Sequence, residues 1–320
     1  AEAATRAAAL GAVAVLIRTA GPFSLSSPHT GMQSYDADAV RRIPAAAVSV
    51  EDAALLARLQ ARGVAGVEVE LYMEAEPHAE RVASRNTVAE ITGTEFPDQV
   101  VLLSGHLDSW DVGFGALDDG GGVFIGVTAL MMLKRLGLRP RRTIRFVAWT
   151  DEEQSGGGQE AYWNTHLNET GKISLVLESD DGVFEPSALN LHGSAEAHAI
   201  LRAVGSALPP PLPPAVNDVA QYMIGYDVGQ AIRNGVPGAT IEQAPVRTYT
   251  GPGAAQSGGD SALAGGAMGT AGHFGGDYFF YHHSMSDTMS SLDPGQMDRC
   301  TALWASYVYA VASLDSLLPR

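Results

Sequence analysis

The sequence predicts an α/β protein with a largely parallel central sheet, and three observations support this fold class. Apolar residues make up 46% of the 320 residues, which is enough for a substantial core. From about Asn86 onward, strand-like runs alternate with helix-like runs, the pattern of strand–helix–strand units. Several of these strand-like runs end directly in acidic residues or histidine, as expected where sites form at the carboxyl ends of parallel strands.

Residues 1–82 form a first predicted region, in which we find no residue with an evident chemical role. Its predicted elements are, in order, an alanine-rich helix, a strand over 13–17, a helix between Ser49 and Gly63, and a strand over 67–73. We interpret its two histidines, His29 and His78, as surface or loop residues.

Residues 83–320 form the second predicted region, where strands and helices alternate. Strands are predicted over 87–91, 99–103, 143–149, 173–177 and 188–191, and helices over 120–136, 157–167, 195–208 and 294–317. Two low-complexity segments interrupt this pattern. The proline-rich segment 208–214 predicts a stiff extended connection, and the glycine-rich segment 250–276 predicts a long loop that either lies on the surface or covers a site.

Composition and charge exclude several functional classes. The net charge of -16 argues against nucleic acid or an anionic membrane as partner, because either would need a basic face. The single cysteine, Cys300, excludes an internal disulfide and a cysteine-rich zinc site, so His, Asp and Glu must hold any metal. The sequence contains no run of about 18 apolar residues, so we expect no membrane span. The chain begins at Ala1 without methionine or a signal pattern, so we expect a targeting segment to lie outside it.

Acidic residues and histidine follow three of the predicted strands. His106 and Asp108 follow the strand over 99–103, three acids follow the strand over 143–149, and Asp180 follows the strand over 173–177. Charges of one sign at one edge of a sheet repel each other unless cations neutralise them. We therefore expect a pair of divalent metal ions at this edge.

Each motif is ambiguous when it is considered alone. Residues two apart in an extended segment face the same way, so the Asp108 carboxylate can hydrogen-bond His106 and fix its tautomer; the alternative is a loop histidine beside a solvated acid. Asp118, which precedes Asp119 and three glycines, is either a buried ligand or an acidic helix cap. A phosphate-binding loop is disfavoured because no Gly-Lys-Ser/Thr follows.

Two pairs of adjacent residues complete the set of candidate metal ligands and catalytic residues. Glu152 and Glu153 are neighbours that point apart, so one can face a water while the other binds metal, although paired acids also commonly begin helices. His282 and His283 follow an aromatic run and supply a further imidazole, but adjacent histidines alone are weak evidence.

Taken together in order, these motifs resemble the co-catalytic zinc peptidases of the aminopeptidase and glutamate carboxypeptidase superfamily. The resemblance covers most of residues 86–320. It is carried by Ser104-Gly-His-Leu-Asp-Ser-Trp-Asp-Val-Gly, Trp149-Thr-Asp-Glu-Glu-Gln, Leu177-Glu-Ser-Asp, Gly235-Val-Pro-Gly-Ala and Tyr281-His-His-Ser-Met-Ser-Asp-Thr-Met. It implies a three-layer zinc-peptidase fold with a mixed, largely parallel central sheet for residues 83–320. Ser27-Pro-His-Thr-Gly resembles the family's protease-associated insert, which implies a partial protease-associated-like domain over 1–82, because the family's usual N-terminal peptidase segment is not in this chain.

The resemblance also implies a role for each site residue. Asp118 would bridge two Zn²⁺ ions per chain, and a cis peptide would follow it. His106 and Asp180 would complete the ligand set of one ion, and Glu153 and His283 would complete the ligand set of the other. Glu152 would be the general base, and Asp108 would support His106. We prefer His283 to its neighbour because its spacing to Asp287-Thr288 fits the family's last motif.

The function implied is that of a zinc-dependent exopeptidase of the carboxypeptidase or dipeptidase type. It would hydrolyse dipeptides or short peptides with a zinc-activated water and Glu152 as general base. The resemblance further implies a homodimer and an extracellular, secretory or lysosomal location. Two alternatives stay open: a non-catalytic binding or receptor module on the same scaffold, and a single-zinc glutaminyl cyclase-like acyltransferase. Filled ligand positions argue against the first, and two tightly bound zinc ions would argue against the second.

Overall fold

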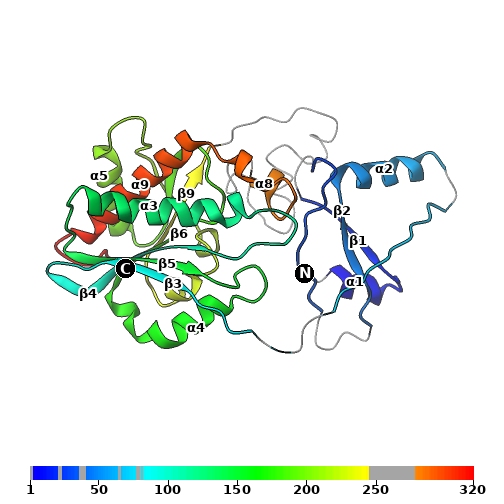
Figure 1. Ribbon diagram of the computed structural model, residues 1–320, viewed down its shortest axis with the longest axis horizontal. Coiled ribbons are helices and arrows are strands. Elements are labelled where there is room, and N and C mark those ends of the chain that lie inside the picture. The colour runs from blue at the N-terminus through cyan, green and yellow to red at the C-terminus, as the bar shows by residue number, and fades with distance from the viewer. Residues whose placement is uncertain are drawn as a thin grey trace.

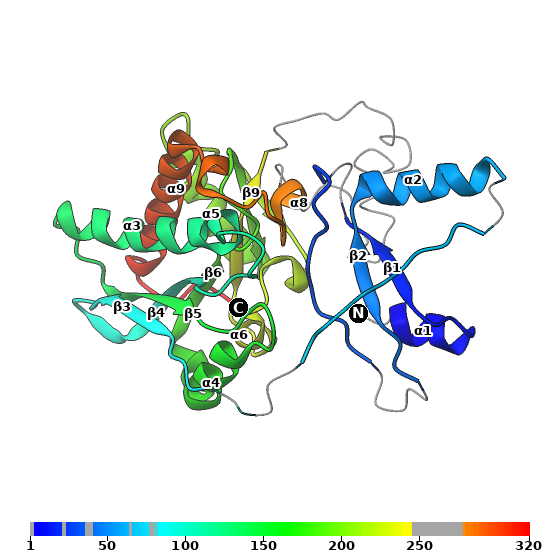
Figure 2. The ribbon, with the colours of Figure 1, turned by 45° about the vertical axis from the view of Figure 1, so that its right-hand side comes forward.

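The computed structural model describes residues 3–20, 24–35, 41–63, 66–76, 80, 82–244 and 278–320. The described residues contain two sheets, one of two strands and one of seven, that share no strand (Figure 1). The small sheet and its helices lie on one side of the molecule and the large sheet on the other (Figure 2). A domain boundary near residue 82 stays a prediction.

The small unit is built around two parallel strands. β1 (Val15–Arg18) pairs with β2 (Ala45–Val48), and helices α1 (Ala3–Ala9) and α2 (Val50–Ala61) accompany them. Ser49 caps α2, because its side-chain oxygen accepts a hydrogen bond from the Asp52 amide at 2.9 Å. The helix expected to begin at Ser49 is therefore confirmed.

Two expectations for this unit are wrong. The strand over 67–73 does not form, because residues 66–76 pair with no strand among the described residues, and alternation alone cannot stabilise a strand without a partner. β2 was not predicted, since a run of alanines has low strand propensity.

The large sheet has the strand order β3-β5-β4-β6-β9-β7-β8. Its central strands β5, β4, β6 and β9 are parallel to one another, whereas β3 and β7 run antiparallel to their neighbours β5 and β9. The strands are β3 (Thr87–Ile91), β4 (Phe96–His106), β5 (Arg142–Trp149), β6 (Ile173–Glu178), β7 (Pro186–His192), β8 (Val216–Asp218) and β9 (Gly238–Gln243). The expected mixed, largely parallel sheet is confirmed.

Helices cover both faces of this sheet, which gives three layers (Figure 1). One apolar cluster joins the sheet to α3, α5 and α9, and a second cluster on the other face joins it to α4 and α6. The helices and short turns are η1 (Ala116–Gly120), α3 (Gly121–Arg135), α4 (Gly157–His166), η2 (Leu167–Lys172), α5 (Ala195–Ala207), η3 (Gln221–Met223), α6 (Gly229–Arg233), α8 (Tyr278–Tyr281), η4 (Met289–Ser291) and α9 (Pro294–Ala312).

Several predicted details of this region are corrected. β8 and β9 were not predicted, and α9 ends at Ala312 rather than 317. The prolines of 208–214 form a turn rather than an extended connection: the Leu212 amide donates to the Pro209 carbonyl at 3.1 Å, and the fixed φ of proline suits such turns. The loop predicted over 250–276 lies outside the described residues.

One helical stretch in the described part of the chain, Ala116–Arg135, has the length and apolar composition of a membrane span. However, 61% of its most apolar window is buried inside the molecule, in the cluster that α3 forms with α9 and the sheet. Core helices commonly have this composition, so it is weak evidence for a membrane span.

Candidate metal centre

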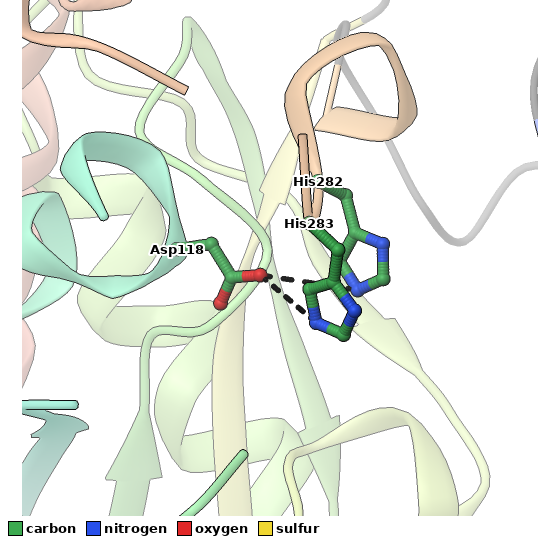
Figure 3. Close-up of side chains that lie close together, drawn as sticks. All are labelled: Asp118, His282 and His283. Carbon is green, nitrogen blue, oxygen red and sulfur yellow. Dashed lines mark ion pairs between the residues drawn. The ribbon is translucent and has the colours of Figure 1, made fainter. Parts of the chain in front are cut away.

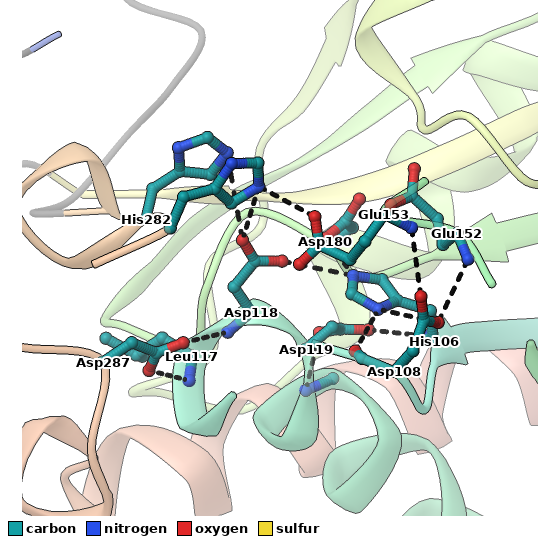
Figure 4. Close-up of polar contacts among 12 residues, drawn as sticks. His106, Asp108, Leu117, Asp118, Asp119, Glu152, Glu153, Asp180, His282 and Asp287 are labelled. Atoms are coloured by element: carbon teal, nitrogen blue, oxygen red, sulfur yellow. Dashed lines mark hydrogen bonds and ion pairs between the residues drawn. The ribbon is translucent and has the colours of Figure 1, made fainter. Parts of the chain in front are cut away.

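The site forms where three parallel strands end side by side. His106 is the last residue of β4, Glu152 and Glu153 follow β5, and Asp180 follows β6. β4 pairs with both β5 and β6, so these ends meet at one edge of the sheet. Asp118 reaches the same place from η1, directly before α3 (Figure 4).

The first cluster contains His106, Asp118 and Asp180. The Nε2 atom of His106 lies 3.2 Å from Oδ1 of Asp118 and 3.1 Å from Oδ1 of Asp180. One ligand atom from each of the three residues fits within 4.8 Å of the others, close enough to share a metal ion. His106 is 1% exposed and Asp118 is 4% exposed, so this cluster is buried.

The second cluster contains Asp118, Glu153 and His283. The Nε2 atom of His283 lies 2.9 Å from Oε2 of Glu153 and 3.4 Å from Oδ2 of Asp118. The ring of His282 stacks on that of His283, with its Nε2 3.8 Å from the same Asp118 oxygen (Figure 3). Asp118 thus offers one oxygen to each cluster, and His283 is nearer to it than His282.

These residues suit a divalent cation. Oδ2 of Asp118 and Oε1 of Glu153 are buried without a hydrogen-bond partner in the described structure, so each lacks the contact that a cation provides. A cavity of about 10 Å³, the volume of a single water-sized sphere, is lined by Asp118, Glu153 and His283. Imidazole and carboxylate ligands are those that zinc takes in sites without cysteine.

The ionisation of these groups reflects their crowding. Burial lowers the pKa of the His106 imidazole, but Asp180 and Asp118 outweigh burial and raise it well above its ordinary value. Burial raises the pKa of the Asp118 carboxyl, but hydrogen bonding to His106 and the charges of nearby histidines lower it to about 2. Asp118 is therefore ionised and ready to bind a cation at neutral pH.

Glu152 lies beside the clusters and has a perturbed carboxyl group. Burial is the largest cause that raises its pKa to about 7; Glu153, Asp118 and Asp108 add to this effect, and His106 opposes it. A carboxyl group that titrates near neutral pH can both accept and deliver a proton, as a general base requires.

Asp108 supports the site differently from the sequence-based expectation. The ring Nδ1 of His106 contacts the main-chain carbonyl of Asp108 at 2.9 Å, whereas its distance to the Asp108 carboxylate is 3.8 Å. That carboxylate accepts hydrogen bonds from the amides of Glu152 at 3.0 Å and Glu153 at 3.2 Å. Asp108 therefore positions the two glutamates with its side chain and His106 with its backbone.

Two acids that sequence reasoning left without a role also shape the site. The Asp119 carboxylate is 1% exposed and accepts from the amides of His106 at 2.9 Å and Gly122 at 3.1 Å. The peptide bond between Asp118 and Asp119 is cis. The Asp287 carboxylate accepts from the amides of Leu117 at 2.7 Å and Asp118 at 3.2 Å, which fixes the bridge-forming segment. Neither acid is distinguishable by sequence from a solvated one.

The small unit also reaches the site. The Thr30 amide donates to the His283 carbonyl at 2.8 Å, and the Thr30 carbonyl lies 3.1 Å from the Nδ1 atom of His283. The Met285 amide donates to Ser27 Oγ at 3.3 Å. His283 itself has a φ of 55°, an unusual value for a non-glycine residue that its surroundings must hold. The segment Ser27–Thr30 therefore orients a candidate ligand.

His29 lies in a loop, one of the two alternatives expected for it, but it is buried and not on the surface. His29 is 8% exposed, its ring lies 6.3 Å from that of His282 between centroids, and neither ring nitrogen has a hydrogen-bond partner in the described structure. Burial is the main cause that lowers its pKa to about 4, with a contribution from His283. His78 lies outside the described residues.

A mixed sheet between two helical layers, with imidazoles and carboxylates gathered at its carboxyl edge, defines an α/β protein with a candidate site for divalent cations. The model of Peptidase family M28 matches residues 86–308. The chain therefore belongs to Peptidase family M28.

Individual relatives agree with this assignment. The chain is 43% identical over 319 residues to Carboxypeptidase Q of Homo sapiens, and the match covers 100% of this chain and 60% of that protein. A crystal structure of a Peptidase M28 precursor from Shewanella amazonensis matches with a TM-score of 0.78 and 28% identity, over 99% of this chain and 64% of that one. A zinc aminopeptidase from Bacillus subtilis shares the fold, with a TM-score of 0.58 and 17% identity over 96% and 65% of the two chains. The chain thus spans about 60% of the length of the curated relatives that it matches.

Proposed function

We propose that this chain is part of a zinc-dependent exopeptidase of the carboxypeptidase or dipeptidase type, which hydrolyses dipeptides or short peptides. Membership of Peptidase family M28 supports peptide hydrolysis, and the relatives named Carboxypeptidase Q support the exopeptidase type. The donor set of imidazoles and carboxylates supports zinc as the metal.

The observation that carries this proposal is the division of Asp118 between two clusters. Oδ1 of Asp118 faces His106, and Oδ2 faces His283. A single carboxylate with one oxygen toward each of two imidazoles is what a bridging ligand requires. We infer two Zn²⁺ ions per chain, one held by His106, Asp118 and Asp180 and the other by Asp118, Glu153 and His283.

Zinc bound at this centre would lower the pKa of a water molecule and polarise the scissile carbonyl. Glu152 would accept a proton from the attacking water and would later deliver it to the leaving amine. In the metal-free site burial is the main cause that raises the pKa of the Glu152 carboxyl to about 7, and bound cations would lower this pKa. Asp108 holds the Glu152 amide at 3.0 Å and so keeps the base in place.

The test combines metal analysis with a dipeptide library. We expect the purified chain to bind two zinc ions by elemental mass spectrometry and to hydrolyse free dipeptides in a chelator-sensitive reaction. Glu152→Gln should retain the zinc and lower kcat by about 10²-fold to 10⁴-fold, the usual contribution of a general base. Glu160→Gln, the same substitution at an exposed position of α4, is the matched control and should leave kcat unchanged.

Three outcomes would contradict the proposal: full activity in Glu152→Gln, one zinc ion at saturation, or zinc binding without hydrolysis of any dipeptide. The second would favour a glutaminyl cyclase-like acyltransferase, and the third a non-catalytic binding module.

Three further features belong to the same proposal. Residues 1–82 form a partial protease-associated-like domain and residues 83–320 the di-zinc peptidase domain. The enzyme is a homodimer and works in an extracellular, secretory or lysosomal compartment. These features rest on the resemblance to the family, and light scattering of the purified chain tests the homodimer directly.

A further inference from the structure

A cleft of about 520 Å³ opens beside the metal centre. Asp180 and His282 line one part of it, so the cleft adjoins both clusters. Tyr222 and Tyr226 contribute aromatic side chains that are 68% and 54% exposed, and Arg233 at the end of α6 contributes a guanidinium group. A cleft of this volume is large enough for a small ligand.

The charge of Arg233 distinguishes it from the rest of this cleft. Of the described residues that line the cleft, Arg233 alone carries a permanent positive charge, whereas Asp180 and Asp181 are acidic. In a chain with a net charge of -16, an anionic group of a substrate would be repelled by most of the surface. Arg233 provides the local positive charge that such a group needs.

Arg233 also has no partner within the described part of the chain, since it forms neither a hydrogen bond nor an ion pair there. Other arginines around the sheet are paired: Arg145 with Glu90, and Arg299 with Glu185. An unpaired guanidinium that lines a cleft can bind a carboxylate without first breaking an existing ion pair.

The position of Arg233 is fixed by its helix. Ala231 and Ile232 of α6 are 0% and 4% exposed, so they anchor α6 in the core directly before Arg233. Gly229 leaves room for the guanidinium, because a Cβ at this glycine would stand 3.3 Å from the Nη1 atom of Arg233. The helix therefore fixes the backbone of Arg233 at the cleft, and the exposed guanidinium lies close to Gly229.

We propose that Arg233 determines substrate specificity by binding a carboxylate of the peptide in this cleft. The carboxylate is either the free C-terminal carboxylate of the substrate or the side chain of an acidic substrate residue. Either group makes a charge-assisted, bidentate contact with a guanidinium. This inference rests on the proposed peptidase function and specifies which substrates its site prefers.

The experiment compares three variants with the unmodified chain on matched substrates. Arg233→Ala removes the charge, Arg233→Lys keeps the charge without the planar fork, and Arg202→Ala is the matched control at an exposed position of α5. The substrates are the dipeptides Ala-Leu and Ala-Glu, each as the free acid and as the C-terminal amide, together with Ala-Gln amide.

For Arg233→Ala we expect KM to rise by about 10-fold to 100-fold on the preferred carboxylate substrate, with kcat little changed, as for a lost charged hydrogen bond. Arg233→Lys should restore part of this loss, and Arg202→Ala should have no effect. If the C-terminal carboxylate is bound, the loss disappears with Ala-Leu amide. If an acidic side chain is bound, it persists with Ala-Glu amide and disappears with Ala-Gln amide.

A binding measurement separates this inference from the proposed function. Calorimetry with Glu152→Gln measures the affinity for Ala-Leu and its amide without turnover, and the double variant with Arg233→Ala repeats it. A carboxylate preference that vanishes with Arg233 supports the inference even if no peptide is hydrolysed. Equal effects of Arg233→Ala on all acids and amides, or no effect on any, would overturn it.

Discussion

The two halves of the candidate metal centre depend on different parts of the chain. His106 and Asp180 come from the ends of neighbouring strands of the large sheet, whose pairing brings these two side chains together, and Asp118 joins them from η1. His283 comes from the loop after α8, has a φ of 55°, and is held by Thr30 of the small unit. The sheet thus places two of the three residues of the first half, whereas the second half also requires two distant segments to meet.

This difference teaches that the small unit does more than accompany the peptidase region. Its helix α2 has no buried residue, so it contributes little to an apolar core. Its segment Ser27–Thr30, however, contacts the loop that carries His283 and places His29 beside His282. Four predictions, from the largest expected effect to the smallest, probe this comparison.

Replacing Asp118 should affect both halves of the candidate metal centre equally, because Asp118 offers one oxygen to each. In Asp118→Asn an amide nitrogen, which cannot bind a cation, replaces one carboxylate oxygen and the negative charge is lost, so we expect loss of both zinc ions and of all measurable peptidase activity. Elemental mass spectrometry and a dipeptide assay check this result. Retention of one tightly bound ion would show that Asp118 is not shared, and Asp111→Asn serves as the control at a nearby acid.

Replacing Asp287 should weaken both halves without removing a ligand. Asp287→Ala leaves the amides of Leu117 and Asp118 without their acceptor, so the bridging residue loses its support. We expect zinc affinity to fall by about 10-fold to 100-fold, the usual effect of losing a group that orients a ligand. Competition with a chelator measures it; equal affinity in the variant and the unmodified chain would contradict the proposed support.

Replacing Thr30 should affect one half alone. Thr30→Pro removes the amide that donates to His283, whereas Thr30→Ala keeps both the amide and the carbonyl and is the matched control. We expect Thr30→Pro to lower the affinity for the ion at Glu153 and His283 by about 10-fold. The affinity for the ion at His106 should not change. Stepwise cobalt titration, followed by absorbance, resolves the two ions. Equal weakening of both would argue that the halves are not independent.

The smallest expected effect is a change in how the stability of the small unit depends on acidic pH when Glu51 is replaced. Burial raises the pKa of Glu51, but hydrogen bonds from Ser24, its own amide and Ser26 outweigh burial and lower it from 4.5 to about 2. Because the folded-state pKa is depressed, the stabilisation is present above pH 4.5 and is lost as the pH falls toward 2.

Glu51→Gln should therefore destabilise this unit at pH 7 by about 1 kcal/mol, given solvent screening. It should also flatten the dependence of stability on pH in that acidic window. Hydrogen exchange of residues 24–52 measures both effects, with Glu70→Gln as the control at an exposed acid. An unchanged acid dependence in Glu51→Gln would contradict the assignment.

Much of the fold could be predicted from the sequence where local pattern and tertiary packing agree. The strands β4, β5 and β6 are continuous apolar runs because they are buried on both faces, and α3 and α5 show helical spacing. The hydrophobic pattern of the sequence did not predict strands correctly where a strand pairs with a partner that is distant along the chain. β9 lies between β6 and β7 although it is far from both along the chain, and the expected strand over 67–73 has no partner among the described residues.

The sequence by itself determined the fold class, the family, and the order of the candidate ligands, because residue type and spacing along one chain carry that information. Only the tertiary structure decided how Asp118 divides its oxygens, that the Asp108 carbonyl rather than its carboxylate contacts His106, and that Thr30 orients His283. The physical reason is that these contacts use backbone groups, which every residue has, or join segments far apart in the chain. Spacing along the chain cannot reveal such contacts.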